Sequence, residues 1–237
     1  IDMLVMDDGW FGKRDDDNSS LGDWYVNEKK LGGSLSELIR RVHEQGVKFG
    51  IWIEPEMVNE DSNLYREHPD WAIQITGKLP VRSRNQLLLD FSRKEVRDNI
   101  FDQICAVFDQ GKIDYVKWDM NRSMADVYAG NLAYDYVLGV YDFMERLVTR
   151  YPDILLEGCS GGGGRFDAGA INRTRIQYGT SFFYPVSSMG AHVSAVPNHQ
   201  TGRVTSLKTR GITAMAGTFG YELNPALLSD EEKEEIR

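Results

Sequence analysis

The chain has 237 residues, of which 41% are hydrophobic and 27% are charged. This length suits one domain with a sizeable core, and this composition excludes a disordered or collagen-like protein. The formal net charge is −9, and the Lys and Arg residues are scattered without a basic stripe, so we expect no nucleic acid partner. A neutral small molecule fits better. No apolar run approaches the roughly 20 residues that cross a bilayer, so we expect no membrane partner either.

The cysteines and the two ends of the sequence indicate its setting. Cys105 and Cys159 are too few for a disulfide framework, and Cys105 falls in an apolar helical pattern typical of a buried reduced thiol. We therefore expect a reducing, cytoplasmic compartment. The sequence begins inside a β-rich run without a signal-peptide pattern and closes on the charged run 229–237, so we expect a piece of a longer protein.

Short β-rich runs alternate with longer segments of helical periodicity, which is typical of βα units and a parallel sheet. The predicted strands are, in chain order, Asp2–Met6, Val47–Ile53, Leu87–Asp90, Ile113–Trp118 and Ile154–Glu157. The first predicted helix, over 34–45, opens with a capping box of Ser34 and Glu37 and stops at Gly46.

Two further helices follow the same pattern. One runs from Ser92, which would form a capping box with Glu95, to Gly111, and it leads straight into a strand. The other covers about 134–150 and precedes Pro152. Strand, helix and strand thus recur in sequence across more than half of the chain, with no linker that divides it.

We expect one domain over residues 1–237 with the fold of a (β/α)8 TIM barrel, of which this length could hold most, because a complete barrel takes about 250 residues. Polar residues that directly follow predicted strands favour the barrel, since such positions converge on one face of it. They are Asp7, Asp8, Glu54, Glu56, Lys117, Asp119 and the run that starts at Cys159. An open, doubly wound sheet is the alternative.

The strongest candidate for catalysis is the end of the strand at 113–118. Its period-two alternation places Lys117, Asp119 and Asn121 on one side. A carboxylate beside a lysine stays ionised and nucleophilic, as covalent glycoside hydrolysis requires. The alternative is a structural Lys–Asp pair, and the spacing leaves both open.

A pair of acids, Asp7 and Asp8, follows the first strand and suits the binding of hydroxyl groups. A metal site would need further ligands at a defined spacing, and the four histidines show none, so we expect no metal and no cofactor. The histidines are His43, His68, His192 and His199. The acidic run 15–17 is interpreted as a solvated surface turn.

Aromatic and glycine residues offer weaker signals. Tryptophans near strand ends suit the apolar face of a pyranose ring, although tryptophan is equally common in a core. They are Trp10, Trp24, Trp52 and Trp118. The run 161–164 of four glycines lacks the Lys-Ser/Thr of a P-loop, so it more simply allows backbone to approach a ligand or a neighbouring loop.

Six motifs stand in a fixed order along the chain: Asp7-Asp8-Gly9-Trp10-Phe11-Gly12, Gly50-Ile51-Trp52-Ile53-Glu54-Pro55-Glu56-Met57, Arg84-Asn85-Gln86, Lys117-Trp118-Asp119-Met120-Asn121-Arg122, Glu157-Gly158-Cys159-Ser160-Gly161-Gly162-Gly163-Gly164-Arg165-Phe166-Asp167 and Ser188-Met189-Gly190-Ala191-His192-Val193-Ser194. Together they resemble the motifs of the α-galactosidases of glycoside hydrolase family 36. The resemblance covers essentially the whole chain.

The resemblance implies a (β/α)8 barrel that hydrolyses terminal α-galactosyl residues of oligosaccharides such as raffinose and melibiose, with net retention. By the same resemblance Asp119 would be the nucleophile, Asp7 and Asp8 would hold galactose hydroxyls, and Trp52 would pack on the sugar. The remaining pocket residues that it implies are Arg84, Lys117, Asn121, Cys159 and Gly162.

The second carboxyl of such an enzyme is missing from this sequence. In the family, the acid/base aspartate lies in a Trp-x-Ser-Asp-x-Thr-Asp-Ala-like segment after the Gly-rich run. Here Arg165–Ala170 passes directly into 171–173, and Asp167 belongs to the Gly-rich motif itself. We therefore expect an incomplete barrel that lacks its first strand and the acid/base segment, without the family's N-terminal β-sandwich and C-terminal β domain.

Two other functions remain open at this point. A galactoside-binding protein without catalysis would explain the missing segment, and an α-galactosyl transferase would share the fold and the covalent intermediate. By resemblance to the larger family members, a homo-oligomer such as a tetramer is also expected.

Overall fold

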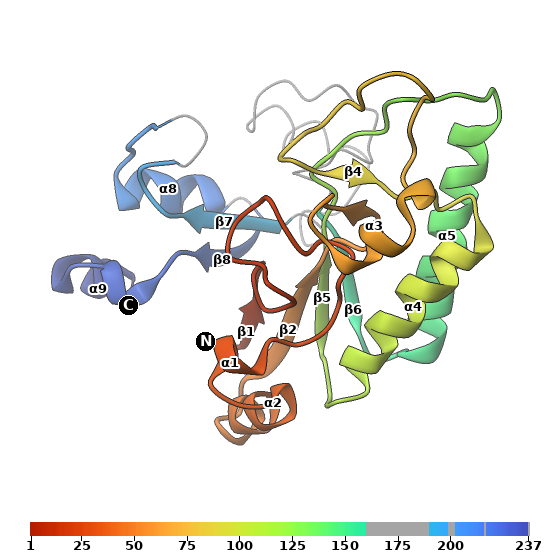
Figure 1. The fold of residues 1–237 in the computed structure, drawn as a ribbon. Coiled ribbons are helices and arrows are strands. Elements are labelled where there is room, and N and C mark those ends of the chain that lie inside the picture. Colours follow the sequence, from red (N-terminus) through yellow and green to blue (C-terminus); the bar gives the residue numbers. More distant parts are fainter. Residues whose placement is uncertain (160–189, 199–201, 216, 237) are drawn as a thin grey trace. The chain divides into compact units, whose positions relative to one another are not determined.

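The computed structural model describes four stretches of the chain, namely residues 1–159, 190–198, 202–215 and 217–236. They fall in two compact units, Ile1–Asp167 and Ala168–Arg237, which are described in turn. Figure 1 shows the elements of both.

The first unit is built on a parallel sheet of four strands in the order β1-β2-β5-β6. These strands are β1 (Met3–Met6), β2 (Lys48–Ile53), β5 (Tyr115–Trp118) and β6 (Leu155–Gly158). Each strand lies beside the next parallel strand along the chain, and the order never reverses. A doubly wound sheet reverses its order at a switch point, so the described strands do not follow that alternative.

Burial differs between the middle and the borders of this sheet. All residues of β2 after Lys48 are buried, as expected for a central strand covered on both faces. At the borders, Leu4 of β1 is 46% exposed and Leu155 of β6 is 64% exposed. The outer strands therefore present apolar side chains that the described part of the unit leaves uncovered.

Three long helices accompany these strands. They are α2 (Leu35–Glu44), α4 (Lys94–Phe108) and α5 (Leu132–Arg150). The predicted cap of α2 is confirmed, since the Ser34 side chain accepts the backbone N–H of Glu37. Helices α4 and α5 pack side by side (Figure 1), and Gly139 lets α5 approach the backbone at Phe91 closely.

The helix at 92–111 begins differently from its prediction. The N-cap of α4 is Arg93, and its side chain forms no capping bond. Ser92 is occupied elsewhere, because both its backbone N–H and its hydroxyl donate to the carboxylate of Asp90. The predicted capping box of Ser92 and Glu95 is therefore wrong.

The strand predicted over Leu87–Asp90 is also corrected. Only β4 (Leu87–Leu88) forms there, and it pairs antiparallel with β3 (Met57–Val58) in a separate two-stranded sheet. Both strands are fully buried, so their apolar runs resemble those of a parallel strand. Whether such a strand is parallel or antiparallel depends on its pairing partner, which the local sequence pattern does not encode.

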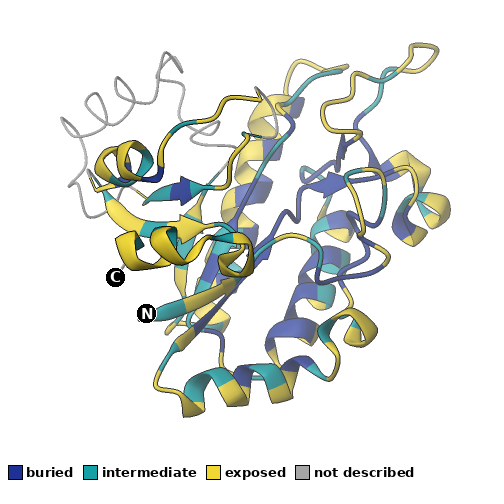
Figure 2. Ribbon diagram, turned by 90° about the vertical axis from the view of Figure 1, so that its left-hand side faces the viewer, coloured by how far each residue is buried: buried dark blue, intermediate teal, exposed yellow. Residues whose placement is uncertain are grey.

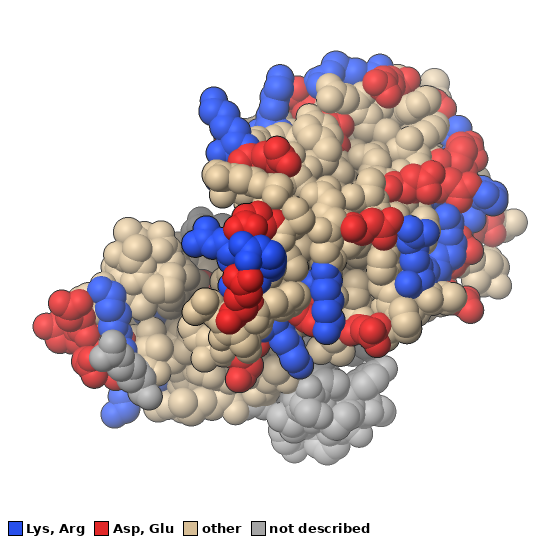
Figure 3. Space-filling view, turned by 90° about the horizontal axis from the view of Figure 1, so that it is seen from below, with Lys and Arg blue, Asp and Glu red and all other residues tan. Residues whose placement is uncertain are grey.

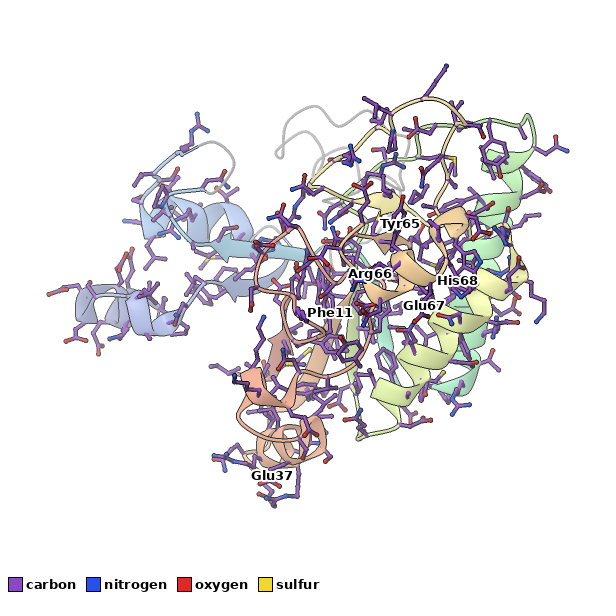
Figure 4. The ribbon with its side chains drawn as sticks, in the orientation of Figure 1. Phe11, Glu37, Tyr65, Arg66, Glu67 and His68 are labelled. Carbon is purple, nitrogen blue, oxygen red and sulfur yellow. The ribbon has the colours of Figure 1, made fainter. Side chains whose placement is uncertain are left out.

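Short elements complete the first unit: α1 (Glu28–Leu31), α3 (Asn63–Glu67) and the 3-10 turn η1 (Pro69–Trp71). Figure 2 shows buried residues along the central strands and on the inner faces of the long helices. Figure 4 places Phe11 among densely packed side chains and Glu37 on the outer side of α2. The buried thiol of Cys105, on α4, lies in this core as predicted.

The second unit is small. Its parallel strands β7 (Gly190–Ser194) and β8 (Thr218–Glu222) are joined through α8 (Leu207–Ala214). The 3-10 turn η3 (Pro225–Leu227) and α9 (Asp230–Ile236) follow. Among its described residues, Val193, Leu207 and Ala214 form a core cluster.

Acidic and basic side chains are mixed on the face seen in Figure 3, where neither sign forms a continuous stripe. Among the described residues, no helix combines the length and the apolar character that crossing a membrane would require.

Candidate active site

The predicted site residues gather at the carboxyl-terminal edge of the parallel sheet. Asp7 follows β1, Glu54 follows β2, Asp119 follows β5 and Cys159 follows β6. The backbone ladder continues past the strand ends, since Asp119 N–H donates to the carbonyl of Ile53 at 2.8 Å. Because the four strands are parallel, these polar groups share one edge, as the sequence predicted.

Asp119 is 7% exposed, and the hydrogen bonds to its carboxylate include three that orient both oxygens. Its Oδ2 accepts from Asn121 Nδ2 at 2.7 Å and from Trp52 Nε1 at 3.2 Å. Its Oδ1 accepts from the backbone N–H of Met120 at 2.9 Å. These donors stabilise negative charge on the carboxylate and hold its orientation.

Trp52 contacts Asp119 through the edge of its indole. Its ring is only 3% exposed and lies within 6.3 Å of the rings of Phe11 and Trp24. Its carbonyl accepts the indole N–H of Trp10 at 2.9 Å. Trp52 thus links an aromatic cluster to the carboxylate, while the packing of its ring on a sugar stays a prediction.

The side chain of Lys117 reaches from β5 to the loop that follows β1. Its Nζ is 3.8 Å from Asp7 Oδ1, with 16% of the lysine side chain and 43% of the aspartate side chain exposed. This ion pair connects β5 with the loop after β1. The alternation of β5 also holds, because Trp118 points the other way and packs against Phe143 of α5.

A chain of alternating charges connects Asp8 with Arg84. Arg14, which is buried, donates to both carboxylate oxygens of Asp8 and also to Asp17. Asp17 in turn accepts two hydrogen bonds from the guanidinium of Arg84, at 3.0 and 3.2 Å. The interpretation of the acidic run as a solvated turn is therefore incomplete for Asp17, which is 44% exposed but binds Arg84 from a distant part of the sequence.

The backbone at Arg84 and Asn85 is strained. Both residues have positive φ angles, 50° and 57°, which side-chain-bearing residues rarely adopt. Asn59 holds this conformation, because its Nδ2 donates to the carbonyl of Asn85 at 2.9 Å and to that of Asp17 at 3.1 Å. The loops at 15–18 and 83–86 are thereby fixed to one another.

The sequence places Glu54 after a strand and inside the motif 50–57 without a role, and the structure gives it a more specific place. Its side chain is fully buried, its Oε1 accepts the backbone N–H of Asn121, and its Oε2 accepts Gln86 Nε2 at 3.1 Å. Burial, and next the negative charge of Asp119, raise the pKa of Glu54 to about 8. At neutral pH Glu54 is therefore mainly protonated.

Glu56, two residues further, is equally buried but serves the scaffold. It accepts the indole N–H of Trp118 at 2.8 Å and the hydroxyl of Tyr136 on α5. It therefore joins the turn after β2 to β5 and to a helix.

Some of the remaining predicted residues do not lie in the described part of the chain. The backbone N–H of Cys159 donates to Trp118 O at 2.8 Å, and its side chain is half-buried. Gly162, the four-glycine run and the first two residues of the motif 188–194 lie outside the described residues. Across the described stretches, no three His, Cys, Asp or Glu side chains form a group that could hold a metal ion.

The sequence matches known proteins over its full length. Residues 1–237 match the Melibiase family. The chain is 83% identical over 252 aligned positions to the bifunctional alpha-galactosidase/sucrose kinase AgaSK of Mediterraneibacter gnavus, covering all of this chain and 27% of that protein. It is 54% identical to the alpha-galactosidase Mel36A of Lactobacillus acidophilus, covering all of this chain and 35% of that one. The chain thus spans about a third or less of the length of these relatives.

Solved structures agree with this. The galactosidase domain of AgaSK superimposes with a TM-score of 0.90 over the whole chain and 35% of that structure. The GH36 alpha-galactosidase AgaA A355E D548N from Geobacillus stearothermophilus, solved in complex with raffinose, superimposes with a TM-score of 0.89 at 49% identity, over the whole chain and 36% of that structure. By the full-length family match and the shared fold, this chain belongs to the melibiase family.

Proposed function

We propose that this chain forms most of the catalytic (β/α)8 barrel of a retaining α-galactosidase, with Asp119 as its nucleophile. The observation that carries the proposal is the Asp119 carboxylate itself, which is nearly buried at a strand end and oriented by three donors. A nucleophile must be ionised and held within a small range of angles, and these contacts supply both conditions.

The proposed reaction is the general one of retaining glycosidases. Asp119 forms a bond to the anomeric carbon while the bond to the leaving oxygen breaks and its electron pair stays on that oxygen, which takes a proton from a general acid. Water then attacks the glycosyl-enzyme, gives its proton to the same group as base, and releases galactose and the Asp119 carboxylate. Two displacements at one carbon retain its configuration.

The substrate class rests on the relatives. Proteins that match the whole chain are called alpha-galactosidases, and related structures were solved with raffinose and with stachyose. In this chain Asp7 pairs with Lys117, whereas Asp8 and Arg84 belong to the chain of alternating charges, and all three would bind sugar hydroxyls. Lys117, Asn121, Cys159, Trp52 and Gly162 are proposed to line the same pocket.

The barrel and its missing parts are proposals as well. The strand order without reversal supports a barrel, and the exposed apolar residues of β1 and β6 fit strands that lack neighbours. The alignment with AgaSK runs over 252 positions for the 237 residues of this chain, so that relative carries at least 15 residues that this chain lacks. This difference supports the loss of an internal segment such as the one expected to bear the general acid.

The test measures release of p-nitrophenol from its α-galactoside by the full-length protein that carries this chain, by its Asp119→Asn variant, and by the 237-residue chain. We expect the Asn variant to lose at least about 1,000-fold in kcat and to keep galactose binding, since a carboxamide cannot form the covalent intermediate. An Asn variant that folds and turns over normally would reject Asp119 as nucleophile. Galactose binding without turnover in the unaltered full-length protein would favour a binding protein.

A further inference from the structure

Glu54 lies one hydrogen bond away from the segment that carries the proposed nucleophile. Its Oε1 accepts the backbone N–H of Asn121, and the side chain of Asn121 donates to Asp119 Oδ2 at 2.7 Å. The two carboxyl groups therefore hold the same asparagine from its backbone and from its side chain. A shift of Glu54 would move Asn121 and, with it, a donor of Asp119.

The surroundings of Glu54 suit a carboxyl group without charge. Its side chain is fully buried, and in the described part of the chain no Lys or Arg forms an ion pair with it. Arg84 is the cation whose charge acts on it, but the guanidinium of Arg84 is bound to Asp17. A buried carboxylate without a cation at hydrogen-bond distance is costly, so such a group keeps its proton.

The second hydrogen-bond partner of Glu54, Gln86, has a carbonyl oxygen that could accept the proton of Glu54. Gln86 is fully buried, its Nε2 donates to Glu54 Oε2, and its Oε1 has no partner. The two ends of an amide are assigned from their hydrogen bonds. With the amide turned over, Gln86 Oε1 accepts the proton of Glu54, and Nε2 takes the position of the oxygen that has no partner.

From this geometry we infer that Glu54 is a positioning residue, which fixes Asp119 for attack through Asn121 while it is itself a neutral carboxyl group. The inference rests on the proposed function, because positioning matters only if Asp119 reacts. It assigns no proton transfer to Glu54. A neutral Glu54 also places no second negative charge beside Asp119.

The ionisation of Glu54 should make kcat depend on pH, which a merely structural role of this residue would not do. Among the described residues, the groups that face Glu54 are Asp119, Asn121, Gln86 and Arg84, and of these Asp119 adds a like charge. With a pKa of about 8, Glu54 ionises in mildly alkaline solution, and its carboxylate then adds a negative charge beside Asp119. We expect kcat of the unaltered protein to fall as the pH rises through this range.

The test compares Glu54→Gln, Glu54→Leu and the control Glu56→Gln in the full-length protein. Galactose binding measured by calorimetry counts the folded sites, so kcat is expressed per folded site. Because small displacements of reacting groups cost up to about 100-fold, we expect Glu54→Leu to lose kcat on this order, and Glu54→Gln to keep at least about tenfold more than Glu54→Leu. Glu56→Gln, whose bonds hold the scaffold, should lower the thermal midpoint and leave kcat per folded site unchanged.

The pH profile decides the role if Glu54→Leu does not fold. In Glu54→Gln the alkaline fall of kcat should move to higher pH, since the glutamine cannot ionise. An unmoved alkaline limb, or full kcat per folded site in Glu54→Leu, would overturn the inference. If the unaltered protein binds galactose without turnover, the proposed function fails by itself. The protonated-carboxyl infrared band at pH 7, present in the unaltered protein and lost in Glu54→Gln, still tests the neutral state of Glu54.

Discussion

Helix α5 approaches the loop before α4 so closely that one glycine is required. A Cβ at Gly139 would lie 1.8 Å from the carbonyl oxygen of Phe91 and 2.7 Å from its carbonyl carbon. The same carbonyl accepts a hydrogen bond from Arg97 Nη1 at 2.6 Å. A Gly139→Ala variant therefore requires the helix or the loop to move by more than an ångström, which opens the α4–α5 packing or breaks this bond.

The size of the effect follows from opposing contributions. Overpacking a dense interface costs about 1–3 kcal/mol or more, and loss of the hydrogen bond adds about 1 kcal/mol. Replacing glycine in a helix returns about 1 kcal/mol. The net destabilisation is about 1–3 kcal/mol, which in a domain of this size lowers the thermal midpoint by roughly 2–12 °C.

The assay is thermal unfolding followed by circular dichroism, with Gly211→Ala as the matched control. Gly211 also lies inside a helix, α8, and a Cβ there would meet no heavy atom within 4 Å. We expect the control to keep or slightly raise its midpoint. Equal midpoints for Gly139→Ala and the unaltered chain would refute the reasoning from close approach.

Two further predictions concern charge. Asp17→Asn removes the carboxylate that holds Arg84, and this partly exposed ion pair is worth up to about 1 kcal/mol. We therefore expect KM for the galactoside to rise about two- to fivefold with kcat little changed. An unchanged KM would show that Asp17 does not hold Arg84 for substrate. Burial raises the pKa of Asp114, but the N–H of Phe49 and the bond to His43 outweigh it, and the net pKa lies below its ordinary value. This group therefore contributes stability above its ordinary pKa that is lost as the pH falls through the lowered one, so midpoints measured from pH 7 to 3 should fall less steeply in Asp114→Asn than in the unaltered chain.

Local patterns predicted most of the parallel sheet and its helices. The strand and helix runs around 47–53 and 34–45 formed within a residue or two of their predicted bounds, because burial and capping there are properties of neighbouring residues. The strand at 87–90 failed, since a short apolar run is the same whether its partner is parallel or antiparallel. The capping box at Ser92 failed because the Ser92 hydroxyl donates to the carboxylate of Asp90 and the helix begins one residue later, with Arg93 as its N-cap.

The position of the candidate site was predictable from the sequence, but the hydrogen bonds and ion pairs that orient its side chains were not. Residues that follow parallel strands must share an edge, so the sequence could place Asp7 and Asp119 together. The bonds that orient the site join residues far apart in the chain, as Asp17 joins Arg84 and Glu54 joins Asn121. The periodicity of the sequence does not indicate such pairs, because within its own segment each residue has the pattern of an ordinary polar residue at the surface or at a strand end.

The two glutamates after β2 show how far alternation can be trusted. Residues two apart on a strand share a face, which would send Glu54 and Glu56 to the same place. The strand ends at Ile53, however, and a turn follows in which the N–H of Met57 donates to the carbonyl of Glu54 at 3.2 Å. The turn rotates Glu56 toward Trp118 and α5, whereas Glu54 stays beside the segment of Asp119. One backbone turn thus assigns two identical side chains to different tasks, which is why Glu56 is the informative control for Glu54.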